Sequence, residues 1–212
     1  MNATRPSPCV SLLVGLDIFE RAAAAVFFTA MAWSFFRSWQ ETGKIVNLVL
    51  LLSESSVVAF ALIRRFTSEV SLKPVDWFVA LLGVTAPLLV RPTGEEALVS
   101  VFVCAPLMLA GFAMQIAAKL TLRRSFGIVA ANRGVKVGGP YRLVRHPMYA
   151  GYVMTQIAFL LTNPSAWNAT VYCIALAIQI SRILAEERVL ACDPSYQVFA
   201  AAVPYRLLPC IF

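Results

Sequence analysis

Histidine and paired cysteines are scarce in this sequence, and their scarcity argues against a metal site. The chain of 212 residues has one histidine, His146. Its five cysteines include no C-x-x-C pair and none lies beside the histidine: Cys9, Cys104, Cys173, Cys192 and Cys210. A zinc site built with one histidine would have to consist almost entirely of thiolates. We therefore expect no bound metal and interpret the cysteines as small apolar residues.

The sequence also has too few charges to cover the surface of a soluble domain. Charged residues make up 14% of the chain and hydrophobic residues 59%, and the mean hydropathy is +0.75. Soluble domains carry about 25% charged residues. The composition therefore predicts a polytopic membrane protein. A net charge of +7 would otherwise suggest a nucleic-acid partner. The basic residues follow the positive-inside pattern of membrane proteins instead, so we expect no binding of nucleic acid.

Long apolar runs predict an all-α bundle of about six hydrophobic segments, at Ala22–Phe36, Ile45–Ile63, Val75–Val90, Ala97–Leu120, Tyr149–Leu161 and Ala166–Ile183. A helix needs about 20 residues to cross a bilayer, a length that the second and fourth runs reach. The third and fifth runs are short. Asn163-Pro164-Ser165 forms a tight break between the last two runs. We expect these two to form a helical hairpin, which need not cross the bilayer fully.

Most basic residues fall on one side of this six-segment arrangement. That side holds Arg5, Arg64, Arg65, Lys73, Lys119, Arg123, Arg124, Arg133, Lys136, Arg142, Arg145, Arg182, Arg188 and Arg206. The other side holds Arg37, Lys44 and Arg91. Because loops rich in Lys and Arg remain in the cytoplasm, we expect a multi-pass protein with both termini and the loop from Thr121 to Met148 cytoplasmic.

Two polar residues interrupt apolar segments. Glu54 lies in the middle of the second segment, where an ionised carboxylate is costly, so it is either a functional residue or a protonated or paired structural one. Gln115 lies in the fourth segment and is expected to form a hydrogen bond between helices.

A polar patch follows the fourth segment, at residues 138–152. It contains the single histidine, two arginines, three tyrosines and two prolines. Gly138 and Gly139 permit close approach of the backbone to a ligand. Pro147 suits the first turn of a helix, whose free N–H groups then point at the loop and favour an anion. A patch of this kind at the mouth of a membrane helix indicates a pocket for a polar cofactor, unless His146 only shapes the turn.

A second polar group follows at the end of the sixth segment. Arg182 and Glu186 are four residues apart and share one face of a helix, whereas Glu187 is turned about 100° from Glu186. Such a pair is usually a solvated helix surface. Here it emerges opposite the His146 patch across a short hairpin, which makes a functional role the competing interpretation.

These residues resemble the isoprenylcysteine carboxyl methyltransferase family and its relatives, the membrane phospholipid methyltransferases. The similarity rests on Arg145-His146-Pro147-x-Tyr149-x-Gly151 followed by Glu186-Glu187-Arg188. It extends from about Lys119 to the end, through Gly139-Pro140-Tyr141 and a tail that begins at Tyr196 and includes Val203-Pro204-Tyr205-Arg206-Leu207-Leu208-Pro209. The resemblance implies N-terminal transmembrane helices at 1–120 and a methyltransferase core at 121–212. Arg123-Arg124 and Cys210 depart from common family glycines, and neither departure touches the cofactor residues.

The resemblance also implies a cytosolic S-adenosylmethionine pocket closed by the C-terminal segment, and a lipophilic methyl acceptor that enters from the bilayer among the membrane lipids. The cofactor residues it implies are Val135, Lys136, Tyr141, His146, Pro147, Tyr149, Glu186 and Glu187. Arg182 and Glu186 are the expected catalytic residues. Arg182, Tyr205 and Arg206 are expected to bind the acceptor, with Arg182 facing its carboxylate.

Other functions compete with methylation of the α-carboxylate of a prenylated cysteine. The acceptor is alternatively a phospholipid amine, a small thiol or another amphiphile. The R-H-P-x-Y pattern also occurs in membrane sterol reductases that use NADPH, but Met148 and the Glu-Glu-Arg run suit a zwitterionic methyl donor better. A transporter or membrane scaffold would use Glu54 and Gln115 and leave the patch without a role.

Overall fold

The computed structural model describes residues 8–43, 45–91, 93, 96–209 and 212. The expectations for Arg5, Lys44 and Cys210 lie outside these residues, as do those for the side chains of Cys9 and Glu54. The regular secondary structure of the described part is helical, apart from one isolated antiparallel β-bridge between residues 70 and 131. The all-α prediction is confirmed.

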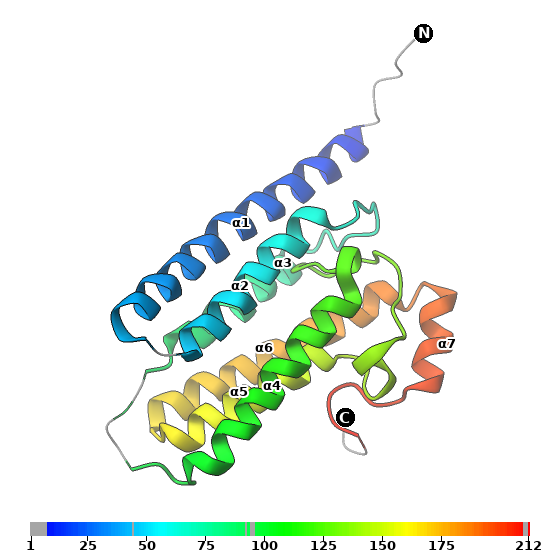
Figure 1. Cartoon of the computed structure of the whole chain (residues 1–212). Helices are drawn as coiled ribbons and strands as arrows, with labels where there is room; N and C mark the ends of the chain where they lie inside the picture. Colours follow the sequence, from blue (N-terminus) through cyan, green and yellow to red (C-terminus); the bar gives the residue numbers. More distant parts are fainter. Residues whose placement is uncertain (1–7, 44, 92, 94–95, 210–211) are drawn as a thin grey trace.

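Seven α-helices and three short 3₁₀ helices make up the described elements (Figure 1). The α-helices are α1 (Pro8–Thr42), α2 (Ile45–Ile63), α3 (Pro74–Thr85), α4 (Val101–Leu122), α5 (Pro147–Thr162), α6 (Ala166–Leu190) and α7 (Pro194–Ala202). The 3₁₀ helices are η1 (Ala86–Leu89), η2 (Arg123–Ser125) and η3 (Gly139–Arg142). The sequence interpretation had no counterpart of α7.

Two helices among the described residues are long and apolar enough to cross a membrane, at Val101–Ser125 and Ala166–Leu190. Only 22% and 33% of the residues in their most apolar stretches are buried, unlike those of a core helix in a soluble protein; the side chain of Phe102, for example, is 86% exposed. Exposed apolar side chains of this size are suited to contact with lipid. α1 has 35 residues and is longer than the predicted run. The predicted run was too short because Asp17, Glu20 and Arg21 interrupt the apolar pattern in the first half of the helix.

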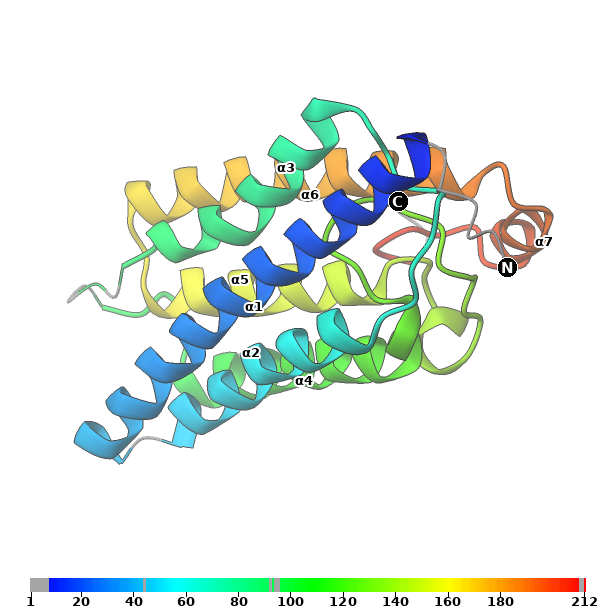
Figure 2. The same ribbon diagram turned by 90° about the horizontal axis from the view of Figure 1, so that it is seen from above.

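The helices pack in three pairs: α1 with α2, α4 with α5, and α3 with α6. Figure 1 and Figure 2 show them side by side, with α7 at one end of the bundle. The packing of α5 against α4 explains why the R-H-P-x-Y-x-G motif ends in a glycine, Gly151. A Cβ atom there would lie 2.6 Å from the carbonyl oxygen of Gly111 and 3.1 Å from the backbone nitrogen of Gln115. The glycine therefore lets α5 approach the backbone of α4.

The predicted hairpin is confirmed, since α5 ends at Thr162 and α6 begins at Ala166. Asn168, which is fully buried, fixes this end of the bundle by donating a hydrogen bond to the carbonyl of Arg91 over 2.9 Å. At the opposite end, the backbone N–H of Arg65 donates to the carbonyl of Arg124 over 2.7 Å. Arg91 thus lies at the other end from Arg65 and Arg124, as the charge pattern predicted.

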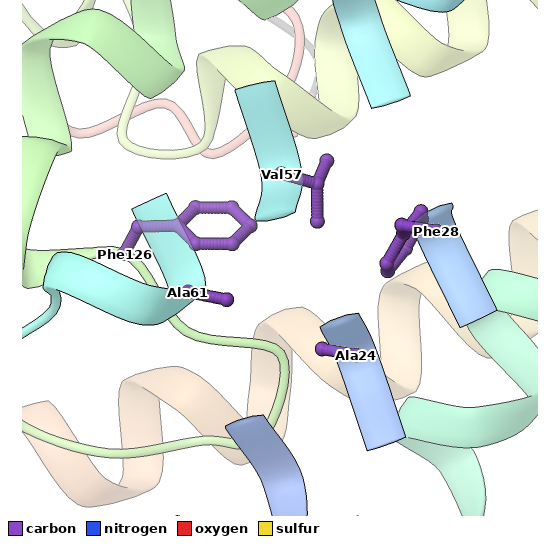
Figure 3. Packing of buried hydrophobic residues seen from close by; sticks show 5 residues of the cluster. All are labelled: Ala24, Phe28, Val57, Ala61 and Phe126. Carbon is purple, nitrogen blue, oxygen red and sulfur yellow. The ribbon is translucent and has the colours of Figure 1, made fainter. Parts of the chain in front are cut away.

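The loop after α4 is anchored to the N-terminal helices by a buried apolar cluster. Phe126 packs against Val57 and Ala61 of α2, and Ala24 and Phe28 of α1 complete the cluster (Figure 3). The loop at 123–137 is therefore held by α1 and α2, although its own sequence forms only a single short 3₁₀ helix, η2.

Candidate active site

A cavity lies at the end of the bundle where the loop after α4, the start of α5 and the end of α6 meet. Its polar lining is provided by Ser125, Arg133, Lys136, Tyr141, Arg145, His146, Tyr149, Tyr152, Arg182, Glu186 and Tyr196. The segment 127–129 and Phe199 are also part of the wall. Segments separated by up to about 170 residues in sequence, from Phe28 to Phe199, therefore form one site.

His146 is the residue before the first turn of α5, which begins at Pro147 as predicted. Its side chain makes no capping hydrogen bond to the helix. Instead its Nδ1 lies 3.6 Å from Glu186 and its Nε2 lies 3.3 Å from Glu187. Burial on its own would lower the pKa of His146, but the hydrogen bonds and charges of the two glutamates outweigh it and raise the pKa. The ring thus contacts both carboxylates, a role that a residue shaping only the turn would not have.

Tyr149 contacts both Arg182 and Glu186. Its hydroxyl donates a hydrogen bond to Glu186, and the guanidinium carbon of Arg182 lies 5.3 Å from the centre of its ring. Arg182 also donates from Nη2 to the carbonyl of Ile128 over 3.0 Å. Gly83 on α3 leaves the space for this arginine, because a Cβ atom there would lie 2.7 Å from its Cδ.

Glu187 binds the residues around the cavity to one another. Its carboxylate accepts hydrogen bonds from Arg145 over 2.8 Å, from Tyr196 over 3.0 Å and from Arg206 over 2.7 Å. These partners come from the patch, from α7 and from the C-terminal tail. Glu187 therefore connects three segments that are separate in sequence.

The C-terminal tail runs back along the start of α5. The N–H groups of Arg145 and His146 donate to the carbonyls of Tyr205 and Arg206, each over 2.9 Å. The guanidinium of Arg206 lies over the ring of Phe212 at 5.1 Å. The tail thereby covers the patch from outside.

A second cavity of about 340 Å³ adjoins the first and extends between the helices. Its wall is mainly apolar and includes Met31, Pro87, Leu88, Met108, Phe112 and Phe159. Arg182, Tyr152, Phe28 and Val84 line both cavities. Arg182 is thus the charged side chain, among the described residues, where a polar space and an apolar space meet.

Comparison with known proteins identifies the core of this arrangement. Residues 102–192 match the Isoprenylcysteine carboxyl methyltransferase (ICMT) family. This part of the chain, which is less than half of its length, is similar to that family. The match confirms the resemblance drawn from the motif and includes α4, α5, α6 and the loop between α4 and α5. No curated protein matches the chain. The family indicates a membrane methyltransferase.

The ICMT-like arrangement brings most of the predicted residues to one cavity. Val135, Lys136, Tyr141, His146, Tyr149, Arg182 and Glu186 line it. Pro147 is the buried first residue of α5, Glu187 contacts His146, and Tyr205 and Arg206 lie in the tail that pairs with the patch. For Glu187, Tyr205 and Arg206 the structure shows contacts with other site residues.

Sequence reasoning missed several residues of the site. Arg145 and Tyr196 were seen only as parts of the family resemblance and were given no role, and Phe199, which lies with Tyr196 on α7, was not considered. Asp193-Pro194 is a start signal for that helix, since Asp193 accepts a hydrogen bond from the N–H of Ser195 over 2.8 Å. Glu20 on α1 was missed because no local pattern connects it to the patch.

Proposed function

We propose that the protein is an integral-membrane, S-adenosylmethionine-dependent methyltransferase that acts on the α-carboxylate of a prenylated cysteine or a similar lipophilic acceptor. The observation that carries the proposal is the junction of two cavities at Arg182. One cavity, the polar cavity, carries the charged side chains of the His146 patch, and the other, the apolar cavity, has a more strongly apolar wall and lies between the helices. A methyl transfer from a polar donor to a lipid requires two such spaces in contact.

The polar cavity suits the chemistry of the methyl donor. S-adenosylmethionine carries a carboxylate, an amino group, a sulfonium and an adenosine. The cavity offers the lysine ammonium of Lys136, the carboxylate of Glu186, and aromatic faces at Tyr141 and Phe199. Lys136 is suited to bind the carboxylate of the donor and Glu186 its cationic or hydroxyl groups, while the rings provide a surface for the purine.

The apolar cavity suits an anionic lipid better than an amine. Arg182 places a permanent positive charge at its polar end. That charge attracts a carboxylate and repels a protonated amine. The walls behind it, formed by Met108, Phe112 and Phe159, suit a prenyl chain. These features support an acceptor that combines a carboxylate with a long apolar group.

The reaction requires little from the protein beyond alignment and exclusion of water. When bound, S-adenosylmethionine supplies a methyl group already activated on a sulfonium sulfur. The α-carboxyl of a prenylcysteine has a pKa near ~3.5 and is ionised at neutral pH, so no general base is needed. Arg182 would orient the carboxylate, and the tail at Arg206 would keep water from the reacting atoms.

The orientation that we propose in the membrane follows from the basic residues at the two ends of the helical bundle. The polar cavity lies at the end that holds Arg124 and Lys136, the end that the charge pattern assigns to the cytoplasm. In this orientation the chain is multi-pass, both termini are cytoplasmic, and the acceptor reaches the apolar cavity from the bilayer.

Transfer of label from S-adenosyl-[methyl-³H]methionine to N-acetyl-S-farnesylcysteine tests this function. The purified protein in lipid should form a base-labile methyl ester, with phosphatidylethanolamine and a small alkyl thiol as comparison acceptors. Label that appears in the phospholipid or the thiol but not in the ester would show that the acceptor is one of those compounds and not a prenylated cysteine. Binding of NADPH without binding of S-adenosylmethionine would refute the methyltransferase.

A further inference from the structure

Glu20 of α1 holds the wall of the polar cavity, although it lies outside the family-matched residues. Its side chain is buried, and its Oε1 accepts hydrogen bonds from the backbone N–H groups of Ile128, over 2.9 Å, and Val129, over 3.1 Å. These two residues line the cavity. A carboxylate on the first helix therefore fixes the peptide groups of a loop that lies 108 residues further along the chain.

The same loop segment is bound from its other side by Arg182. The N–H of Ile128 points to Glu20, and the carbonyl of Ile128 accepts from Nη2 of Arg182 over 3.0 Å. Ile128 thus connects a residue of α1 to the arginine at the junction of the two cavities. If the segment moved, Arg182 would lose the backbone acceptor that holds its guanidinium.

Buried arginines hold the carboxylate of Glu20 in turn. Nη1 of Arg64 lies 2.5 Å from Oε1, and Nη2 of Arg133 lies 3.7 Å from Oε2. The side chains of both arginines are at most 1% exposed. The carboxylate is therefore held in place, because breaking a buried ion pair is costly.

We propose that Glu20 is a positioning residue for methyl transfer, which acts through the Ile128 peptide to hold Arg182 against the acceptor. The proposal rests on the proposed function of Arg182. It makes α1 a part of the site, so that a core limited to the matched residues 102–192 would lack one of its supports.

Asp17 provides a matched control on the same helix. It is also buried and pairs with Arg64 over 2.7 Å and with Arg21 over 2.7 Å. Its carboxylate accepts from these two arginines and is not among the acceptors of the loop N–H groups at 127–130 in the described structure. Asp17→Asn therefore removes a charge from the same cluster without removing a hydrogen bond from the loop.

Two conservative variants separate position from charge. Glu20→Asp keeps the charge but is one methylene too short to reach the loop, whereas Glu20→Gln keeps an oxygen in reach but loses the charge. We expect E20D to lower kcat/KM for the acceptor about 10-fold, because a small misplacement of an orienting group is costly. The Kd for S-adenosylmethionine should change less than about 2-fold. E20Q should lose less of the acceptor kcat/KM than E20D, and D17N should keep most of it.

A double-mutant cycle tests the route through Arg182. In an Arg182→Ala background, E20D should lower kcat/KM by less than about 2-fold, because the group it positions is absent. Equal effects of E20D with and without Arg182 would overturn the proposal. So would a loss in E20Q and D17N equal to that in E20D, since charge alone would then explain the effect.

A measurement without activity keeps this test separate from that of the proposed function. Hydrogen exchange at the amides of Ile128 and Val129 should become faster in E20D and stay near wild type in D17N. Unchanged exchange in E20D would overturn the positioning role. If exchange changes as expected while no acceptor is methylated, the proposed function fails and the hold of Glu20 on the loop stands.

Discussion

The guanidinium carbon of Arg182 lies 5.3 Å from the ring centre of Tyr149, and the hydroxyl of the same tyrosine donates to Glu186. The tyrosine therefore separates a cation at the edge of the apolar cavity from a carboxylate in the polar cavity. A pair four residues apart on one helix face need not be a simple ion pair. Here both side chains line the polar cavity and Arg182 also lines the apolar one, which suits a division of labour between donor and acceptor.

The first prediction follows from this separation. Glu186→Ala should weaken binding of S-adenosylmethionine, because a charge-assisted hydrogen bond is worth about 1.5–3 kcal/mol, or roughly 10- to 150-fold in Kd. Arg182→Ala should leave that Kd nearly unchanged and raise KM for the acceptor. Calorimetric titration gives the first quantity and initial rates the second. If both substitutions weaken donor binding equally and spare the acceptor, Arg182 has been assigned to the wrong substrate.

Gly83 offers a way to move Arg182 without changing it. In Gly83→Ala the new Cβ would lie 2.7 Å from Cδ and 2.8 Å from Nη1 of Arg182, so the flexible side chain must shift. We expect KM for the acceptor to rise about 10-fold, as for other small misplacements, with donor binding and thermal stability near wild type. Gly15, where a Cβ would meet nothing within 4 Å, gives the control Gly15→Ala. An unchanged acceptor KM in Gly83→Ala would show that the exact place of the guanidinium is unimportant.

Local patterns predicted the features of this site that depend on near neighbours in the sequence. The break at Asn163-Pro164-Ser165 and the start of α5 at Pro147 follow from backbone chemistry, and the shared face of Arg182 and Glu186 follows from helix spacing. The long first half of α1 was not predicted, because a hydropathy pattern does not detect a helix segment that contains several polar residues.

Contacts over long sequence separations could not be predicted in this way. Arg64 and Arg133 were counted among the basic residues that set orientation, yet the structure buries both beside Glu20 and Asp17. A charge count cannot distinguish a solvated arginine from a buried, paired one. Burial also lowers the pKa of Arg133 to about 10, a shift that only the folded surroundings produce.

The third prediction concerns Glu187 and the tail. Glu187→Ala removes the acceptor shared by Arg145, Tyr196 and Arg206. Loss of one partner from a largely buried ion pair costs about 3–5 kcal/mol, so we expect a clear fall in the thermal midpoint and faster proteolysis of the tail. Arg188→Ala is the control, because its pairing with Asp76 involves a side chain that is 47% exposed. An equal fall in both variants would contradict the connecting role of Glu187.

The fourth prediction concerns orientation in the membrane. On a cysteine-free background, Arg124→Cys should react with an impermeant maleimide only from the cytoplasmic side, and Leu98→Cys only from the opposite side. Both positions are exposed, whereas Arg133 is buried and would report poorly. Reaction of Arg124→Cys from the outer side would reverse the orientation and place the polar cavity away from cytosolic S-adenosylmethionine.

The last prediction uses the raised pKa of His146. The glutamates Glu186 and Glu187 hold the ring protonated above its ordinary pKa of 6.5, against the desolvation that lowers it. A folded-state pKa above the unfolded value means that the folded protein binds the proton more tightly. The resulting stabilisation is complete below about pH 6.5 and is lost as the pH rises through the folded-state pKa. The unfolding free energy of the wild type should therefore fall relative to that of His146→Gln as the pH is raised from 6.5 upwards. Denaturant titrations of both proteins at several pH values measure this difference. A difference that stays constant with pH would show that His146 does not change its protonation in that range, and its contacts with the two carboxylates would then be those of a neutral ring.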